Sequence, residues 1–198
     1  MNYLNFFVIL ICIILFSCID RFNFAHYNDI KVVRTTRDST YYKDGLLFSG
    51  FVRKYVDNKK LLSFSLDEGK IDGEYVEYYY NGYLKNISNF KNGELEGKFL
   101  SYYDNNLLME EVNYQNGLME GERILYWNNG NVKEKNILKK GAIIGKSEFY
   151  YANGSLRKII SFDINGRRDG DWIDYYPDGE IKLKVVYVSG KVLNNVSH

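Results

Sequence analysis

GLMEGERILYWNNGNVKEKNILKKG, at residues 117–141, is the clearest copy of a unit that repeats along most of this chain. The first glycines of successive units lie 24, 24, 24, 25 and 24 residues apart, at Gly69, Gly93, Gly117, Gly141, Gly166 and Gly190. A second series is Gly73, Gly97, Gly121, Gly145 and Gly170, and a third is Gly82, Asn106, Gly130, Gly154 and Gly179. A fixed period of this length indicates a repeat architecture.

Each unit is predicted to be a β-hairpin. The pairs Asn81-Gly82, Asn129-Gly130, Asn153-Gly154 and Asp178-Gly179 are typical of two-residue type I′ turns, in which both residues have positive φ,. The G-x-x-x-G segments then supply the return turns, so all these glycines are assigned structural turns. The prediction is an all-β protein, in which tandem 24-residue hairpins form an elongated, twisted antiparallel single-sheet meander.

Composition agrees with strands and offers few groups for catalysis near neutral pH. The 198 residues include 19 Tyr and 12 Phe but only 2 His, 2 Cys and 1 Pro, and aromatic residues favour pleated strands. The formal net charge is +1, with acids and bases mixed along the chain, so nucleic acid is not an expected partner,.

The amino-terminal segment is interpreted separately from the fold. An apolar run of 14 residues from Phe6 to Ile19 has the length of a secretory signal core,. Leu15-Phe16-Ser17-Cys18 resembles the bacterial lipobox, which implies that Cys18 is acylated and becomes the new amino terminus. An uncleaved signal anchor and a buried apolar start in a soluble protein are the two alternatives.

Four regions follow from these patterns. They are a lipoprotein signal peptide at 1–17, a lipidated tether at 18–41, a repeat array at 42–192 and a C-terminal tail at 193–198. Within the tether, residues 30–36 are the one stretch that could form a short strand. A degenerate first unit runs through Tyr42, Gly45, Gly50, Tyr55 and Leu61.

The tandem Y-x-x-N-G-x-L units resemble the MORN-variant repeat proteins, including antitoxin or immunity-like members, over roughly Tyr42 to Val192. The resemblance implies a single elongated sheet without a two-layer core. It also implies protein binding, membrane association or neutralisation of a partner toxin. Fold alone does not define function, so these roles are implied by analogy.

Candidate chemical sites are weak. Residues 140–147, KGAIIGKS, are one residue too short for a phosphate-binding loop,. Asp163, Asn165, Asp169 and Asp171 surround the 25-residue unit without the spacing of a calcium loop,. We expect no catalytic residue, metal or cofactor. A carbohydrate-active enzyme using carboxylates among Glu74, Glu77, Glu110 and Glu111 is the least favoured alternative.

Two aromatic columns run through the units. One contains Tyr78, Tyr102, Tyr126, Tyr150 and Tyr175, and the next position contains Tyr79, Tyr103, Trp127, Tyr151 and Tyr176. Alternation along a strand places Val76 and Tyr78 on one side, where an apolar stripe interrupted only by Glu148 is the predicted packed face. The second column is either inter-hairpin packing or a candidate binding strip.

These observations predict an exported protein, anchored by lipid in the cell membrane or outer membrane. Its expected function is non-enzymatic binding of a protein partner, with toxin neutralisation as one form. The alternatives are a structural envelope lipoprotein without a specific ligand, or a carbohydrate-binding or carbohydrate-active protein.

Overall fold

The computed structural model describes residues 24–34 and 39–197, so the predicted signal peptide and Cys18 lie outside the described residues. Most described residues belong to strands, and one 3-10 helix, η1, spans Tyr27–Asp29. The first strands are β1 Phe24–His26, β2 Lys31–Arg34, β3 Ser39–Lys43, β4 Leu46–Leu47, β5 Gly50–Val56, β6 Lys59–Asp67, β7 Lys70–Tyr78, β8 Leu84–Lys91 and β9 Glu94–Leu95. The remaining strands are β10 Gly97–Tyr102, β11 Leu108–Gln115, β12 Leu118–Tyr126, β13 Val132–Lys139, β14 Ala142–Tyr150, β15 Leu156–Phe162, β16 Arg168–Tyr175, β17 Ile181–Val188 and β18 Lys191–Ser197.

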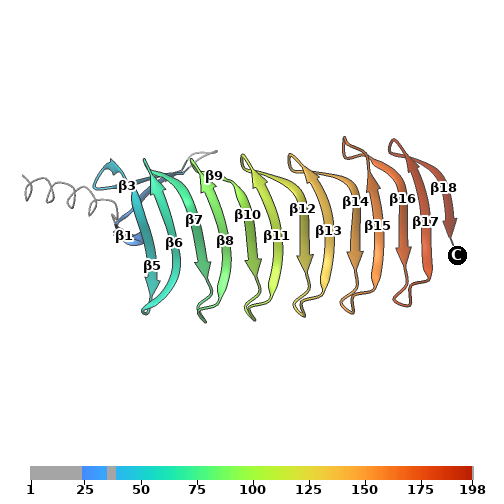
Figure 1. Ribbon diagram of the computed structural model, residues 1–198, viewed down its shortest axis with the longest axis horizontal. Helices are drawn as coiled ribbons and strands as arrows, with labels where there is room; N and C mark the ends of the chain where they lie inside the picture. The colour runs from blue at the N-terminus through green and yellow to red at the C-terminus, as the bar shows by residue number, and fades with distance from the viewer. Residues whose placement is uncertain (1–23, 35–38, 198) are drawn as a thin grey trace, which may run out of the picture.

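The strands form one long sheet of 15 strands and a small sheet of three (Figure 1). From β5 to β18, strands consecutive in sequence pair antiparallel, except that the short β9 and the following β10 both pair with β8. The predicted single-sheet meander is confirmed. Residues 193–197, expected to be a tail, instead continue the ladder as part of β18, because β17 offers its backbone edge to them.

The return turns are the tight ones. Between the paired residues Asp67 and Lys70, Glu68 and Gly69 have φ values of 45° and 75°, as a two-residue type I′ turn requires,. The same pair of positive φ values recurs at Asn92-Gly93, Asn116-Gly117, Lys140-Gly141 and Ser189-Gly190.

The Asn-Gly turns differ from the prediction. Gly82 has a φ of 91°, but Asn81 is not among the residues with positive φ. The Tyr79 N–H donates to Tyr83 O at 2.8 Å and the Gly82 N–H donates to Tyr79 O at 2.9 Å, so the loop has three residues. It therefore has the pattern of a type I turn followed by a left-handed residue. The left-handed position of Gly130, Gly154 and Asn106 is confirmed, whereas the two-residue length is wrong.

The second glycine of each unit lies in a β-bulge. Phe64 faces Tyr75 whereas Leu66 faces Ile71, so β7 has extra residues opposite β6, and Gly73 is among them with a φ of 93°. Such insertions bend a strand, and the long strands are curved in Figure 1. The G-x-x-x-G segment thus combines a turn glycine with a bulge glycine.

The amino-terminal end of the sheet is capped. Strand β1 pairs in parallel with β5, and the three-stranded sheet β2-β3-β4 lies beside them. Together they enclose a core whose members are each at most 9% exposed: Ala25, Ile30, Phe48, Val52, Phe64 and Leu66. The predicted tether is therefore wrong for residues 24–34, because burial of Ala25 and Ile30 against the first hairpin orders this segment.

Candidate binding surface

One side of the long sheet is the packed face. We define it by the row of cross-strand neighbours that contains Val52, Phe64, Tyr75, Ser88, Phe99, Val112, Arg123, Asn136, Ser147, Ile160, Trp172 and Val185. Val112 is 2% exposed, while Asn136 and Ser147 are each 1% exposed. Small polar residues reach such burial only when longer neighbours close over them. Arg123, which bonds Glu110 at 2.6 Å, is one such neighbour of Asn136.

The opposite side is the tyrosine face. We define it by the row Val76, Ile87, Leu100, Glu111, Ile124, Lys135, Glu148, Ile159, Ile173 and Lys184, with the tyrosine column from Tyr78 to Tyr175 two residues further along alternate strands. The prediction that this side is packed holds for Val76 and Ile173, which are 5% and 9% exposed, but the predicted stripe interrupted only by Glu148 is wrong. Strands β11, β13 and β17 place Glu111, Lys135 and Lys184 between the apolar residues. The sequence pattern considered only one strand of each hairpin and therefore did not include them.

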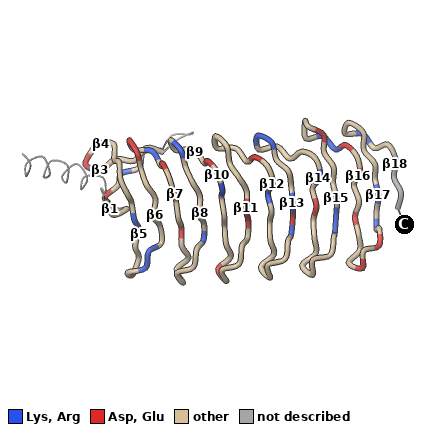
Figure 2. Tube along the Cα trace, in the orientation of Figure 1, with Lys and Arg blue, Asp and Glu red and all other residues tan. Residues whose placement is uncertain are grey.

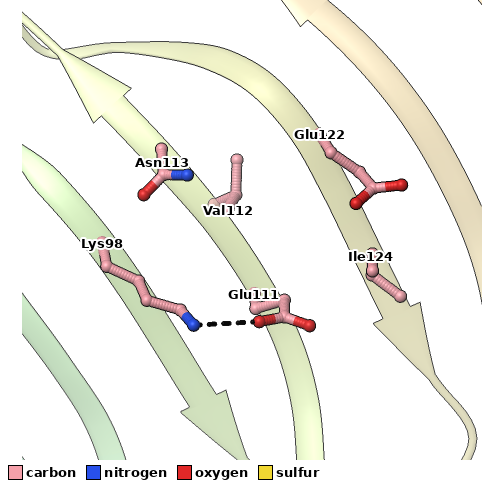
Figure 3. A pocket seen from close by; sticks show the side chains of 6 residues that line it. All are labelled: Lys98, Glu111, Val112, Asn113, Glu122 and Ile124. Carbon is pink, nitrogen blue, oxygen red and sulfur yellow. Dashed lines mark ion pairs between the residues drawn. The ribbon is translucent and has the colours of Figure 1, made fainter.

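A hollow of about 180 Å³ lies on the tyrosine face at the centre of the array. Figure 3 shows Lys98 on β10, Glu111 on β11 and Ile124 on β12 around it. Lys98 Nζ lies 3.1 Å from Glu111 Oε2, and the Tyr126 hydroxyl donates to Glu111 Oε1 at 2.6 Å. The hydrogen bond from Tyr126 and the nearby Lys98 lower the pKa of Glu111, while burial and this carboxylate raise the pKa of Tyr126 to about 12.

The same chemistry recurs one unit later. Lys146 Nζ lies 2.6 Å from Glu148 Oε1, and the Tyr150 hydroxyl donates to Glu148 Oε2 at 2.7 Å. Lys146 first, and then Tyr150, lower the pKa of Glu148 below its ordinary value of 4.5. Burial and the neighbouring carboxylate raise the pKa of Tyr150 to about 12. The tyrosine face thus presents rings and carboxylates held in fixed positions.

We expect the Glu148 cluster to make stability depend on acid pH. Because the folded pKa is depressed, the contribution is full above the ordinary value of 4.5 and is lost as pH falls through the folded pKa,. Glu148→Gln should lower the free energy of unfolding at neutral pH by about 0.5 kcal/mol, the scale of a partly exposed pair. The difference from the unaltered chain should shrink toward pH 3, measured by urea unfolding. A difference that stays constant with pH would contradict this role.

The candidate binding strip lies where the strands enter the three-residue turns. Three tyrosine hydroxyls there donate to a backbone carbonyl of the next hairpin: Tyr79 to Tyr102 O at 2.7 Å, Tyr103 to Tyr126 O at 2.7 Å and Tyr151 to Tyr175 O at 2.8 Å. Trp127 Nε1 does the same to Tyr150 O at 3.2 Å. These four rings are half-buried, and Tyr176 in the last unit is 43% exposed. The geometry favours a structural role, and the strip as a binding site stays a prediction.

Turn asparagines add a second connection between units. Asn81 Nδ2 donates to Asp104 O at 3.0 Å, Asn105 Nδ2 to Asn128 O at 3.0 Å and Asn129 Nδ2 to Ala152 O at 2.8 Å. In the same turns the asparagine Oδ1 accepts a backbone N–H two residues later, as Asn81 does from Tyr83 at 3.0 Å. The asparagine is thus needed for its side chain rather than for a positive φ.

Tyr103→Phe tests the structural role of the second column. Loss of the hydroxyl removes the bond to Tyr126 O, so we expect the free energy of unfolding to fall by about 1 kcal/mol,. Tyr176→Phe is the matched control, because its hydroxyl has no hydrogen-bond acceptor among the described residues. Urea unfolding measures both. Equal effects of the two variants would remove the proposed connection between hairpins.

Carboxylates dock the return turns, a feature that the sequence prediction missed. In four return turns, the backbone N–H of the first turn residue donates to a carboxylate of the preceding unit. Asp72 accepts from Asn92, Glu96 from Asn116, Glu120 from Lys140 and Asp169 from Ser189, at 2.8–3.0 Å. Each acid follows a return-turn glycine by three residues. That spacing is visible in the sequence and could have revealed them.

The one unit of 25 residues lacks this carboxylate contact. The acid position of that unit is Ile144, which has no carboxylate for the next turn. That turn is instead a three-residue loop capped by its own Asp163, whose Oδ1 accepts the Asn165 and Arg167 N–H groups at 2.8 and 2.9 Å. The Arg167 backbone bond is the first cause of the lowered pKa of Asp163.

The other candidate carboxylates are engaged elsewhere. Glu110 bonds Arg123 on the packed face, whereas its neighbour Glu111 lies on the tyrosine face. Glu77 and Glu110 share a face but stand three strands apart, about 14 Å at the usual strand spacing and beyond the reach of a glycosidase pair,. Across the described residues, no group of three or more possible metal ligands is present.

The comparison with family models agrees with this geometry. The MORN repeat variant model matches residues 71–92, 95–116, 119–139, 144–163 and 168–189, together more than half of the chain. The chain belongs to the MORN-variant repeat family. No curated protein matched the chain. MORN-variant units therefore run from β7 to β17, and the β5–β6 hairpin and its cap lie outside the matched repeats.

MORN repeats are commonly membrane- or protein-binding modules, and an extended sheet suits a binding scaffold. In the part of the chain that the structure describes, no helix is both long and apolar enough to span a bilayer.

Proposed function

We propose that this chain is a lipid-anchored, non-enzymatic binding scaffold of the cell envelope, whose tyrosine face binds a protein partner. The observation that carries the proposal is the cluster of Tyr126, Glu111, Lys98 and Ile124 at the centre of that face. Rings and charges already held in place lose little conformational freedom on binding. Anchoring through Cys18 would keep the exported chain at the cell membrane or outer membrane.

The shape of the surface favours a protein over a small molecule. The hollow around Glu111 is about 180 Å³ and another, near Arg53, is about 230 Å³. Small-molecule sites usually enclose roughly 300–1,000 Å³ and bury most of the ligand. An open sheet with tyrosines among charged groups instead has the composition of a protein interface.

The anchor is tested by Cys18→Ala. We expect complete loss of labelled fatty-acid incorporation and accumulation of the unprocessed chain, because the thiol is the atom that is acylated. Metabolic labelling and the mass of the amino-terminal peptide measure both effects. Cys12→Ala, within the same apolar run, is the matched control and should label normally. Labelling of Cys18→Ala at the normal level would exclude a lipoprotein.

The partner-binding face is tested by photo-crosslinking in intact cells. A photoreactive phenylalanine analogue replaces Tyr102 or Tyr126 on the tyrosine face, or Tyr114 on the packed face as control. We expect one discrete, saturable adduct from the first two positions and none from Tyr114. The analogue at Tyr176 tests the candidate strip separately.

The outcome also separates the alternatives. A toxin in the adduct would make the scaffold an immunity-like neutralising protein, whereas a glycan in the adduct would favour a carbohydrate-binding one. Absence of any discrete adduct from Tyr102 and Tyr126 would reject protein binding by this face. A structural lipoprotein without a specific ligand would then be the better description.

A further inference from the structure

The β5–β6 hairpin carries an unusual concentration of positive charge. Residues 51–60, FVRKYVDNKK, contain four cations and one acid, a net charge of +3, whereas the whole chain has +1. Figure 2 shows these cations along β5 and at the start of β6. None of them forms an ion pair with a carboxylate of the described residues, so their charge is not neutralised within the fold.

Exposed aromatic rings surround these cations. We define the basic hairpin patch as Phe24, Phe51, Arg53, Tyr55, Lys59 and Lys60. Its three rings are 39–49% exposed, and the Phe24 and Phe51 rings stack with centroids 5.5 Å apart. The Arg53 guanidinium lies 4.7 Å from the Phe24 ring centroid. Arg53, Lys59 and Lys60 are themselves exposed.

The patch includes a hollow suited to an anionic group. Phe51, Arg53, Lys60, Ser63 and Ser65 line this hollow of about 230 Å³, and Glu74 is its single acid. Guanidinium and ammonium groups beside a serine hydroxyl are the donors that bind phosphate oxygens. Aromatic rings next to them suit the zone between lipid headgroups and acyl chains.

We propose that the basic hairpin patch docks on the surface of an anionic phospholipid membrane and orients the array there. The inference rests on the proposed anchor at Cys18 for its choice of a membrane over an acidic protein. Phe24 follows Cys18 by six residues, so an extended connection spans at most about 20 Å,. The patch is thereby held close to the bilayer, within about two and a half Debye lengths at physiological salt.

This placement has a consequence for the rest of the sheet. The patch belongs to the capped end, outside the five matched repeats, and the array extends from there toward β18 (Figure 1). The patch lies on the same side of the sheet as the tyrosine face, because Arg53 pairs with Ser63 and Ser63 pairs with Val76. The membrane contact and the partner contact nevertheless use different residues.

Lysine footprinting of the full, processed chain tests the docking. The protein is reconstituted into vesicles of phosphatidylglycerol or of phosphatidylcholine, and an amine-reactive reagent is followed by peptide mass spectrometry. We expect Lys59 and Lys60 to react at least about fivefold more slowly on the anionic vesicles, and high salt to abolish the difference. Lys182 and Lys191, at the far end, should react equally on both.

A matched pair of charge reversals completes the test. Arg53→Glu should abolish most of the protection of Lys59 and Lys60, while Arg157→Glu should leave it unchanged. The two variants change the charge equally. Both arginines are also exposed and lie over a phenylalanine ring, at 4.7 Å for Arg53 and 5.9 Å for Arg157. Thermal unfolding checks that both variants fold.

The same digest separates the two proposals, because the amino-terminal peptide reports whether Cys18 is acylated. If Cys18 is acylated but Lys59 and Lys60 are labelled equally on both kinds of vesicle, the docking is overturned and the anchor is supported. Charge-dependent protection without acylation would support the docking and reject the anchor. Protection in native envelopes but not on anionic vesicles would overturn the membrane assignment in favour of an acidic protein.

Discussion

Phe64→Ala is expected to lower the free energy of unfolding by about 3–5 kcal/mol, the cost of deleting a buried aromatic ring and leaving a cavity. Phe64 is 3% exposed, and its ring lies between those of Tyr41 and Tyr75, at centroid distances of 5.5 and 5.6 Å. It thus joins the cap, the first hairpin and the first matched repeat. Loss of the ring should loosen all three.

The measurement is urea unfolding combined with hydrogen exchange of β5 to β7, because a repeat array can unfold unit by unit. Phe51→Ala is the control on the opposite side of the same hairpin. Phe51 is 39% exposed, so we expect a loss of about 1 kcal/mol or less,. If Phe64→Ala costs no more than Phe51→Ala, the capped core does not stabilise this end of the sheet.

Gly69→Ala is expected to cost about 2–4 kcal/mol, because backbone strain adds to a steric clash. The residue has a φ of 75°, and an added Cβ would lie 2.7 Å from Leu47 Cδ2 and 2.9 Å from Tyr41 O. The Gly69 N–H and C=O also bond the cap, to Phe48 O at 2.9 Å and from the Tyr41 N–H at 2.8 Å. Movement of the turn to relieve the clash would therefore disturb these bonds.

Gly45→Ala is the matched control, because it changes the second residue of another tight turn. Its φ is 82°, but no atom lies within 4 Å of the added Cβ, so only the backbone strain of about 1 kcal/mol applies,. Urea unfolding compares the two variants directly. Equal losses would show that the cap does not press on the Gly69 turn.

The contacts between units explain how a sheet without a two-layer core remains ordered along the array. Three of the three-residue turns reach forward through a ring and an asparagine, as Tyr103 does to Tyr126 O and Asn105 does to Asn128 O. Each docked return turn reaches back to a carboxylate, as Lys140 N–H does to Glu120. Stability is then a sum of units and nearest-neighbour contacts, which the capped core supplements at one end.

The sequence by itself determined the hairpin unit, its period and the left-handed positions, because glycine and asparagine report backbone φ locally. Gly130, Gly154 and Asn106 have the expected positive φ. The turn length could not be predicted from the sequence, since an Asn-Gly pair fits both a two-residue turn and the end of a three-residue turn. The register of the flanking strands decided between them.

Only the tertiary structure decided which face is packed and how the amino-terminal segment folds. Which side chains share a face depends on cross-strand pairing and on bulges, and these bring Glu111 and Lys135 between Leu100, Ile124 and Glu148,. Ala25 and Ile30 carry no repeat signal, because their burial comes from residues more than twenty positions away in the β5–β6 hairpin. Nonlocal contacts of this kind leave no period in the sequence.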